Sequence, residues 1–447
     1  MKLPTMMKRL MKSVNRLNAW NIPELDSCNS VIRISPDVNV PITKRVQRII
    51  DTAPFRRLSR ISQLGLVAFV YPGATHTRME HSLGVYRNAI EFLNRLSNDS
   101  TFFQSVSEEH ARLFLVAALL HDVGHWPFCH AIEDMRIEGI PRHESLAERL
   151  ITTGELAESI EKDWQLVPDD VAQFLSCAND DKSIGLLQSM LNGPIDIDKI
   201  DYLERDSLHA GVPYGRNFDR NRLISSLCVD PVHNKLGITD KGRTAAEMLV
   251  FARYIMFSEV YWHHAVRSAT AMLQRSVFEI ARNSDITPPW IDMTESEMID
   301  GLRRASNQRP WAACTEGLFG PHRKLFKRVA QFDRLGHPVQ HRALARKPYQ
   351  DLIEFSHRIA STLSRMLGIS VGPHDILIDA PPVKLEVQFQ IDVRQSDGSF
   401  RPLGKLSPVV HALATQQFDD MVKRVRIFVR PDLQEPLQDI NFAELVL

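Results

Sequence analysis

Residues 117–130, Ala-Ala-Leu-Leu-His-Asp-Val-Gly-His-Trp-Pro-Phe-Cys-His, constrain this chain more than any other stretch. An apolar helical run ends in the adjacent pair His121 and Asp122, a glycine then allows a turn, and His125 and His130 follow. An apolar helix has no packing need for imidazoles and a carboxylate at its end, whereas these groups suit a first-row divalent metal. The alternative is a helix end with a His–Asp hydrogen bond and a C-cap glycine. Whether the chain has further candidate metal ligands distinguishes the metal site from the simple helix end.

The composition is that of a globular protein with a large core. The chain has 447 residues, a formal net charge of +0 and 44% hydrophobic residues, which leaves room for a second lobe. Balanced charge gives no general support for a nucleic acid or an anionic membrane as partner, so an anionic ligand needs a local cluster. Five cysteines without CxxC spacing are typical of a reducing compartment and favour neither a disulfide framework nor a zinc ribbon. Because no segment resembles a signal peptide or a membrane span, we expect a cytoplasmic protein.

Hydrophobic periodicity predicts a mainly α fold with a smaller C-terminal α+β lobe. We predict three regions: a basic N-terminal extension over 1–30, a catalytic body over 31–290 and the lobe over 291–447. The predicted helices cover residues 43–62 (interrupted near Pro54), 78–96, 108–120, 143–152, 169–177, 184–192, 195–209, 243–281, 294–304, 348–367 and 409–421. The predicted strands cover residues 31–34, 236–239, 376–378, 385–393 and 425–429.

Two further residues can complete a metal site with His121 and Asp122. His81 lies near the start of a predicted helix, and Asp198 lies in the acidic run Asp-Ile-Asp-Lys-Ile-Asp-Tyr over 196–202. Neighbouring helices of a bundle can bring four such side chains to one point. Two imidazoles and two carboxylates leave positions open on an octahedral ion for water and a phosphate oxygen. We therefore expect one divalent metal ion on these four residues.

The order of these motifs resembles the HD-domain superfamily of metal-dependent phosphohydrolases. The sequence motifs around these residues resemble its dNTP triphosphohydrolase branch, which includes the bacterial dGTPases and the sterile-alpha-motif HD-domain enzyme of animals. The resemblance implies an HD-domain helical bundle and one metal ion, whether Mn, Fe, Ni, Zn or Mg, with Mg²⁺ as a possible companion of the triphosphate. It extends from about residue 30 to about residue 430. The motifs that carry it are Gln63-Leu64-Gly65, Tyr71-Pro72-Gly73-Ala74-Thr75-His76, Arg78-Met79-Glu80-His81-Ser82-Leu83-Gly84-Val85, residues 121–130, His143-Glu144 and residues 196–206.

The resemblance also implies roles for individual residues. Attack at the α-phosphorus by a metal-activated water would release tripolyphosphate and a deoxynucleoside, whose leaving 5′-oxygen needs a general acid. His130 is our first choice for that acid and His125 the second. Burying a triphosphate of about four negative charges requires fixed cations and donors. The residues implied to face the triphosphate are Arg78, His125, His130, His143, Lys199 and Tyr202. Gln63 and Asp206 are implied near the deoxyribose, and His264 at a further active-site position.

Assembly and regulation also follow from the resemblance. Family members form tetramers or hexamers, so we expect a homo-oligomer with a possible nucleotide effector at a subunit interface. The basic residues 322–328 resemble a segment that meets effector phosphates, and the alternative is a solvated basic helix face. Asp51 is kept, but Arg56 and Ser59 replace the other two guanine-binding residues, so guanine-specific activation is not expected.

Other interpretations remain open at this point. The chain can be a different HD phosphohydrolase, acting on a nucleoside monophosphate, a cyclic nucleotide or an alarmone, or a non-catalytic nucleotide-sensing HD module. A nucleic-acid partner has no support in the sequence. Among single residues, His76 can be a surface histidine and Lys199 a solvated lysine. Tyr254, Tyr261 and Trp262 fit a core at least as well as a base-stacking platform.

Overall fold

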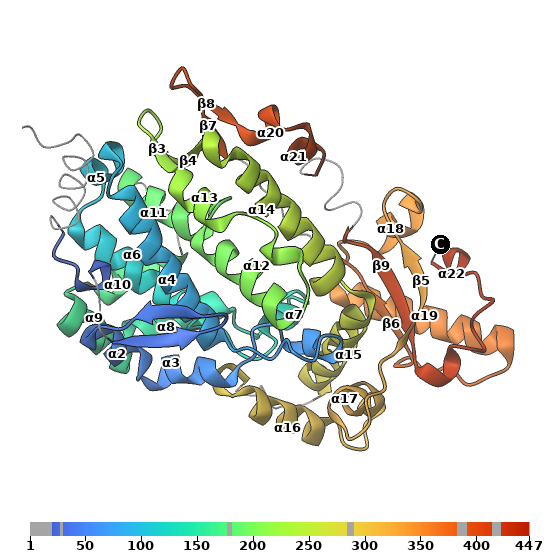
Figure 1. Cartoon of the computed structure of the whole chain (residues 1–447). Helices are drawn as coiled ribbons and strands as arrows, with labels where there is room; N and C mark the ends of the chain where they lie inside the picture. Colours follow the sequence, from blue (N-terminus) through green and yellow to red (C-terminus); the bar gives the residue numbers. More distant parts are fainter. Residues whose placement is uncertain are drawn as a thin grey trace, which may run out of the picture.

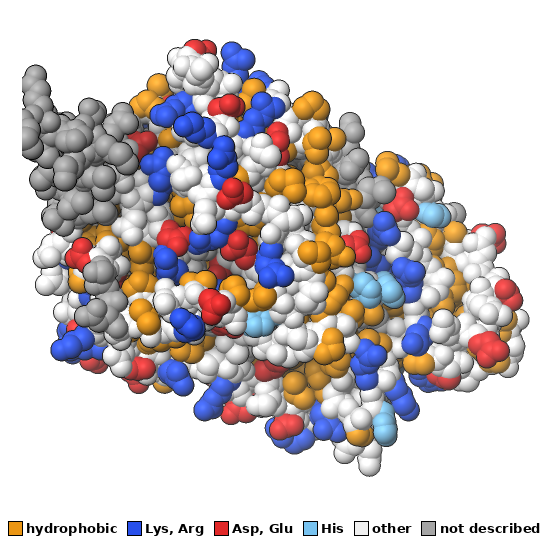
Figure 2. Space-filling model, viewed as in Figure 1, with side chains coloured by type: hydrophobic (Ala, Val, Ile, Leu, Met, Phe, Trp, Pro, Cys, Tyr) orange, Lys and Arg blue, Asp and Glu red, His pale blue; other side chains and the backbone are white. Residues whose placement is uncertain are grey.

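The computed structural model describes residues 20–26, 30–176, 181–283, 290–381, 391–413 and 422–446. It confirms the mainly α fold with a smaller α+β lobe after the helical body (Figure 1). On the face shown in Figure 2, basic and acidic side chains are intermixed. Among the described helices, none has the length and apolar character needed to cross a bilayer.

The helical body contains most of the helices. They are α2 (Lys44–Ile50), α3 (Ala53–Arg57), α4 (Arg78–Leu96), α5 (Ser100–Ser105), α6 (Glu108–Leu120), α7 (Cys129–Glu133), α8 (His143–Thr152), α9 (Gly154–Trp164), α10 (Pro168–Ser176), α11 (Lys182–Asn192), α12 (Ile197–His209), α13 (Arg220–Ser226), α14 (Arg243–Ile255) and α15 (His264–Asn283). The later helices are α16 (Glu295–Ser306), α17 (Ala312–Phe319), α18 (Pro338–Leu344), α19 (Tyr349–Leu367), α20 (Leu403–Leu406), α21 (Pro408–Ala412) and α22 (Phe442–Leu445).

Three small sheets accompany the helices. β1 (Val31–Ile34) pairs antiparallel with β2 (Val38–Pro41). The second sheet has the order β3 (Leu227–Asp230), β4 (Lys235–Thr239), β7 (Asp392–Arg394) and β8 (Phe400–Pro402), with β4 and β7 parallel. In the lobe, β9 (Val425–Val429) lies between β5 (Lys327–Phe332) and β6 (Ile376–Asp379), antiparallel to both, and α19 packs beside β6 (Figure 1).

The helices α4, α6 and α12 form the centre of the body, and each begins at a side-chain cap. Thr77, Ser107 and Asp196 accept hydrogen bonds from the backbone N–H three residues on, which satisfies a donor that the helix leaves unpaired. All residues of α6 from Leu113 to Leu120 are buried. The apolar run therefore packs as core, and its carboxyl end delivers the His-Asp pair to the interior.

Two glycines allow the close approaches that the site needs. A Cβ at Gly84 of α4 would lie 1.9 Å from Oδ1 of Asp201 on α12, and a Cβ at Gly124 would lie 2.2 Å from the carbonyl oxygen of His143. Neither position has room for a side chain, because backbone and buried polar atoms already fill the space. Gly84 thus brings α4 against α12, and Gly124 brings the His-Asp turn against α8.

Most predicted elements are confirmed. The helices predicted over 78–96, 108–120 and 143–152 and the strand over 31–34 have the predicted bounds. The three cysteines in the described part of the chain are free and buried. The strand predicted over 385–393 and the helix over 409–421 lie partly outside the described residues, which contain only β7 and α21 of them. Residues 1–19 of the predicted extension also lie outside, and the boundary at 290 stays a prediction.

The single helix predicted over 243–281 is wrong. α14 ends at Ile255, the π-helical segment Met256–Tyr261 follows, and α15 begins at His264. A π turn takes up extra residues without ending the helical direction, so the apolar pattern continues through it. The break turns Tyr261 towards Asp206.

Candidate active site

At the meeting point of α4, the end of α6 and α12, one ligand atom from each of His81, His121 and Asp122 lies within 4.8 Å of the others, and Asp198 lies beside the two histidines. Nε2 of His81 is 3.3 Å from Nε2 of His121 and 3.1 Å from Oδ1 of Asp198. Asp122 places Oδ1 3.5 Å from Nε2 of His121 and Oδ2 4.0 Å from Nε2 of His81. Atoms bound to one metal at about 2.0–2.2 Å are separated by about 3 Å or slightly more. The arrangement therefore fits a divalent cation.

The outer nitrogens of both histidines are held by hydrogen bonds. Nδ1 of His81 is 2.9 Å from Oδ2 of Asp201, and Arg205 donates to both oxygens of Asp201 over 2.8 and 2.7 Å. Nδ1 of His121 is 2.9 Å from the carbonyl oxygen of Ala118. Such bonds fix the tautomer and turn each Nε2 inward. Asp201 and Arg205 are given no role by the sequence analysis, although their i and i+4 spacing and the i+3 spacing of Asp201 from Asp198 place all three on one side of α12.

The charges around this point favour a cation. Burial lowers the pKa of His81, but hydrogen bonds with Asp198 and Asp201 outweigh it and raise that pKa to about 10. Despite burial, the neighbouring His125, His121 and Arg78 hold the pKa of Asp122 well below its usual range. Arg78 donates to Oδ2 of Asp122 over 2.7 Å. The carboxylates thus draw a proton onto His81, and a bound metal ion would take the place of that proton.

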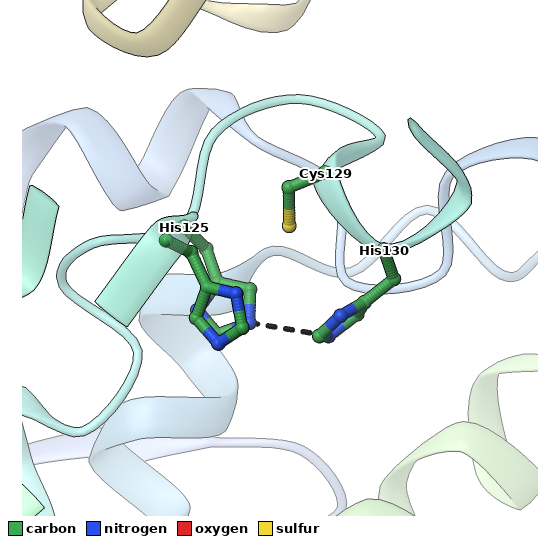
Figure 3. A group of neighbouring side chains, drawn as sticks. His125, Cys129 and His130 are labelled. Carbon is green, nitrogen blue, oxygen red and sulfur yellow. Dashed lines mark hydrogen bonds between the residues drawn. The ribbon is translucent and has the colours of Figure 1, made fainter. Parts of the chain in front are cut away.

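A second cluster of three histidines lines the same cavity as His121, Asp122 and Asp198, a space of about 580 Å³. The Nε2 atoms of His125 and His130 are 3.2 Å apart (Figure 3). Nδ1 of His143, the first residue of α8, is 2.9 Å from Oε2 of Glu133. All three predicted histidines are therefore brought together beside the metal ligands. Glu133 is an orienting residue that sequence reasoning missed.

Two of these imidazoles have lowered pKa values. Desolvation, reinforced by the charge of Arg78, lowers the pKa of His130 to about 4 and the pKa of His125 well below its usual range. His125 is buried, whereas His130 is exposed and lines the cavity. His130 is thus the histidine that a ligand in the cavity can reach.

The two residues predicted near the deoxyribose, Gln63 and Asp206, both contact His76. Oδ1 of Asp206 is 2.9 Å from Nε2 of His76, and the Tyr261 hydroxyl donates to Oδ2 over 2.6 Å. The Gln63 backbone N–H donates to the His76 carbonyl, and its buried Oε1 has no hydrogen-bond partner among the described residues. The surface alternative for His76 is wrong, because the residue is 4% exposed and its ring stacks on His209.

The other residues predicted to contact the substrate are Lys199, Tyr202 and His264, and each has different surroundings. Lys199 is not solvated, since its ammonium donates to the buried Asp196 over 2.6 Å. Tyr202 packs beside Tyr261, with ring centroids 6.4 Å apart. His264 is exposed at the start of α15, its ring lies tilted against that of His263 with centroids 4.4 Å apart, and it does not line the 580 Å³ cavity.

Two alternatives from the sequence can now be decided. The basic side chains within residues 322–328 are exposed, as the solvated alternative requires, but they lie on an extended segment that leads into β5 and not on a helix. Trp262 is 7% exposed and lies beneath the Arg267 guanidinium, 4.4 Å from the ring centroid, as its core alternative requires.

Comparison with known proteins agrees with this geometry. Residues 78–206 match the HD domain, and residues 218–445, slightly more than half of the chain, match the HD associated region. An uncharacterized protein from Methanocaldococcus jannaschii is 34% identical over 280 residues, 62% of this chain and 56% of the relative. The human deoxynucleoside triphosphate triphosphohydrolase SAMHD1 is 29% identical over 293 residues, 57% of this chain and 45% of the relative.

The solved structures agree over a longer region. A hypothetical protein from Aquifex aeolicus superimposes with a TM-score of 0.69 at 27% identity, covering 92% of this chain and 99% of that one. The chain spans only about half the length of the curated relatives that it matches. From these matches and from the convergence around His121 and Asp122, the chain belongs to the HD-domain family of phosphohydrolases.

Proposed function

We propose that this protein is a metal-dependent hydrolase that cleaves deoxynucleoside triphosphates at the α-phosphate, giving a deoxynucleoside and tripolyphosphate. The observation that supports the proposal most strongly is the 580 Å³ cavity, which is lined both by residues of the metal-ligand set and by three histidines. The name of the human relative supports the substrate class. A divalent cation held by His81, His121, Asp122 and Asp198 would polarise a phosphoryl oxygen and activate water.

The chain's own groups account for the charge of the substrate and for the proton that the reaction needs. Arg78, fixed against Asp122, supplies a buried positive charge beside the α-phosphate. His130 is neutral in the free protein, and the negative charges of a triphosphate would raise its pKa so that it carries a proton. It would then donate this proton to the leaving 5′-oxygen. His125, 3.2 Å away, is the second candidate, and Glu133 holds His143 in position.

The sugar and the outer phosphates would meet the remaining residues. We propose that Asp206 and Gln63 face the deoxyribose, with Tyr202 and Lys199 between the sugar and the phosphates. Lys199 would then share its charge between Asp196 and the substrate. His264, near the positive charges of Arg328 and Arg426, is proposed as an outer phosphate contact. A homo-oligomer and a nucleotide effector are also part of the proposal.

Product analysis tests the proposal directly. The purified protein is incubated with each dNTP, singly and mixed, in the presence of Mn²⁺, Mg²⁺, Fe²⁺, Ni²⁺ or Zn²⁺. With at least one of these metals, we expect equal amounts of deoxynucleoside and tripolyphosphate. Inorganic phosphate or pyrophosphate alone would indicate a different HD phosphohydrolase. Binding without turnover in every combination would indicate a nucleotide-sensing module, and light scattering with and without nucleotide would report the assembly.

A further inference from the structure

A second group of metal-binding side chains lies beside the one described above. One ligand atom from each of His125, Cys129, His130 and His143 lies within 4.8 Å of the others. In Figure 3 the sulfur of Cys129 points into the space between His125 and His130. We propose that these four residues form a second metal site, selective for a soft or borderline divalent cation such as Zn²⁺, with the Cys129 thiolate as one ligand.

The spacing of the donors fits a tetrahedral ion. Two imidazole nitrogens at about 2.0–2.1 Å from zinc, at a tetrahedral angle, are about 3.3 Å apart, and the Nε2 atoms of His125 and His130 are 3.2 Å apart. A thiolate at about 2.3 Å from zinc lies about 3.6 Å from each nitrogen. Since all four atoms already lie within 4.8 Å, a movement of about 1 Å closes the site.

An outer carboxylate holds one of these histidines as it would in a metal site. Nδ1 of His143 is 2.9 Å from Oε2 of Glu133, whereas Nδ1 of His125 lies 3.2 Å from Oδ1 of Asp122 but has no hydrogen-bond partner among the described residues. A carboxylate at the far nitrogen of a histidine is the usual support of a zinc ligand. The group therefore has the donors of a structural or inhibitory zinc site, and His143 also has its outer partner.

The backbone arranges the group at some conformational cost. Phe128, which precedes α7, has φ 57 and ψ 18, a left-handed conformation that few non-glycine residues adopt. This turn brings Cys129 and His130 back over His125. Unusual backbone of this kind is concentrated at ligand-binding sites. The mechanism proposed above gives Cys129 no role, although its side chain is 1% exposed and faces three histidines.

Binding at this site exchanges a proton for a metal ion without oxidation or reduction. Zn²⁺ forms the Zn–S bond as the thiol proton leaves to solvent, and the three imidazoles bind through their lone pairs. Burial raises the pKa of the Cys129 thiol to about 12, so without a metal the thiol stays protonated and unreactive. Loading should therefore become tighter as the pH rises.

Zinc at this site would block hydrolysis. It would occupy nitrogens of His125 and His130, the two proposed proton donors, and it would carry a positive charge at the mouth of the phosphate cavity. This consequence rests on the proposed function, whereas the metal site itself does not. We infer that a rise in free Zn²⁺ switches the enzyme off without displacing the ion on the HD residues.

The test uses the full chain with Asp198→Ala, which weakens the first site. Titration with Co²⁺ should give one equivalent of bound metal and a thiolate-to-cobalt charge-transfer band. We expect Cys129→Ser to abolish the band and Cys314→Ser, the matched control at another buried free cysteine, to retain it. A band that persists in Cys129→Ser, or cobalt bound without a band, would overturn the proposal.

A measurement with Cys129 intact covers the case in which Cys129→Ser does not fold. X-ray absorption on the zinc-loaded Asp198→Ala protein should detect one sulfur at about 2.3 Å and nitrogens at about 2.0–2.1 Å. Zinc with only nitrogen and oxygen neighbours would refute thiolate ligation.

A kinetic measurement then tests the inhibition. In the Mn²⁺-loaded protein, Cys129→Ser should raise the free Zn²⁺ needed for half-inhibition at least tenfold, and Cys314→Ser should leave it unchanged. If no dNTP is hydrolysed, the cobalt and absorption results still decide the metal site. If dNTPs are hydrolysed but no sulfur ligates the metal, only the second site is refuted.

Discussion

At the scale of single residues, the candidate site depends on which way each histidine faces. Either ring nitrogen of His81 could face the other metal ligands. Because Nδ1 lies 2.9 Å from Oδ2 of Asp201, Nε2 is the nitrogen that faces them. The metal-ligand set could be predicted because its residues recur in a known order. Asp201, Arg205 and Glu133 could not be given roles, because an orienting carboxylate has no signature until the fold shows which nitrogen it contacts.

Asp201→Asn is expected to weaken metal binding. An amide accepts a weaker hydrogen bond from His81 and no longer neutralises Arg205, so the affinity for Mn²⁺ should fall about 10–100-fold. Isothermal titration calorimetry of the folded variant measures this affinity. Asp240→Asn, at an exposed position remote from the ligands, is the control and should bind as wild type does. An unchanged affinity in Asp201→Asn would remove the orienting role.

His130→Ala is expected to separate chemistry from metal binding. Because His130 contacts His125 and the cavity and is not one of the four ligands on the HD residues, the Mn²⁺ content of protein loaded with Mn²⁺ alone should stay at the wild-type value. Loss of a general acid should slow turnover about 10²–10⁴-fold. Single-turnover rates and metal analysis on the same sample measure the loss of turnover and the metal content. His233→Ala, an exposed histidine, should leave both values unchanged, and full turnover in His130→Ala would exclude it as the acid.

At the scale of elements, the sequence predicts helices well and their interruptions poorly. Helices α4, α6 and α8 are predicted to the residue, because each begins and ends where its apolar pattern does. The segment Met256–Tyr261 could not be predicted, since a π turn shifts the helix face without a proline, a glycine or a polar run. Its effect appears only in three dimensions, where Tyr261 reaches a carboxylate on α12.

Tyr261→Phe tests what this irregular segment contributes. The substitution removes the hydrogen bond to Oδ2 of Asp206, a residue that is 2% exposed. Leaving a buried carboxylate without one of its hydrogen-bond donors lowers stability by about 1–3 kcal/mol. We expect the free energy of unfolding in urea to fall by that amount. Tyr214→Phe, at a half-buried position, is the control and should change it by less than about 0.5 kcal/mol. Equal stability of the two variants would show that the Asp206 contact contributes nothing.

At the scale of the whole molecule, one buried ion pair joins the helical body to the lobe. Arg267 of α15 donates to Asp379 of β6 over 2.5 and 3.1 Å, and the two residues are 9% and 1% exposed. Arg426 of β9 lies 3.7 Å from the same carboxylate and donates to the carbonyl oxygen of Trp262. Because α15 follows directly on the segment that carries Tyr261, this contact connects the lobe to the candidate site.

Arg267→Met is therefore expected to destabilise the whole fold. Removing one partner of a buried pair leaves Asp379 with only the more distant Arg426, which should cost about 3–5 kcal/mol. Arg282→Met, an exposed arginine on the same helix, is the matched control and should cost less than about 0.5 kcal/mol. Denaturant unfolding followed by far-ultraviolet circular dichroism and tryptophan fluorescence measures both variants. If the pair joins body and lobe, the two signals coincide in wild type and separate in Arg267→Met, because the lobe then loosens first. Coincident signals with an equal loss in both variants would show that the pair is only a local contact.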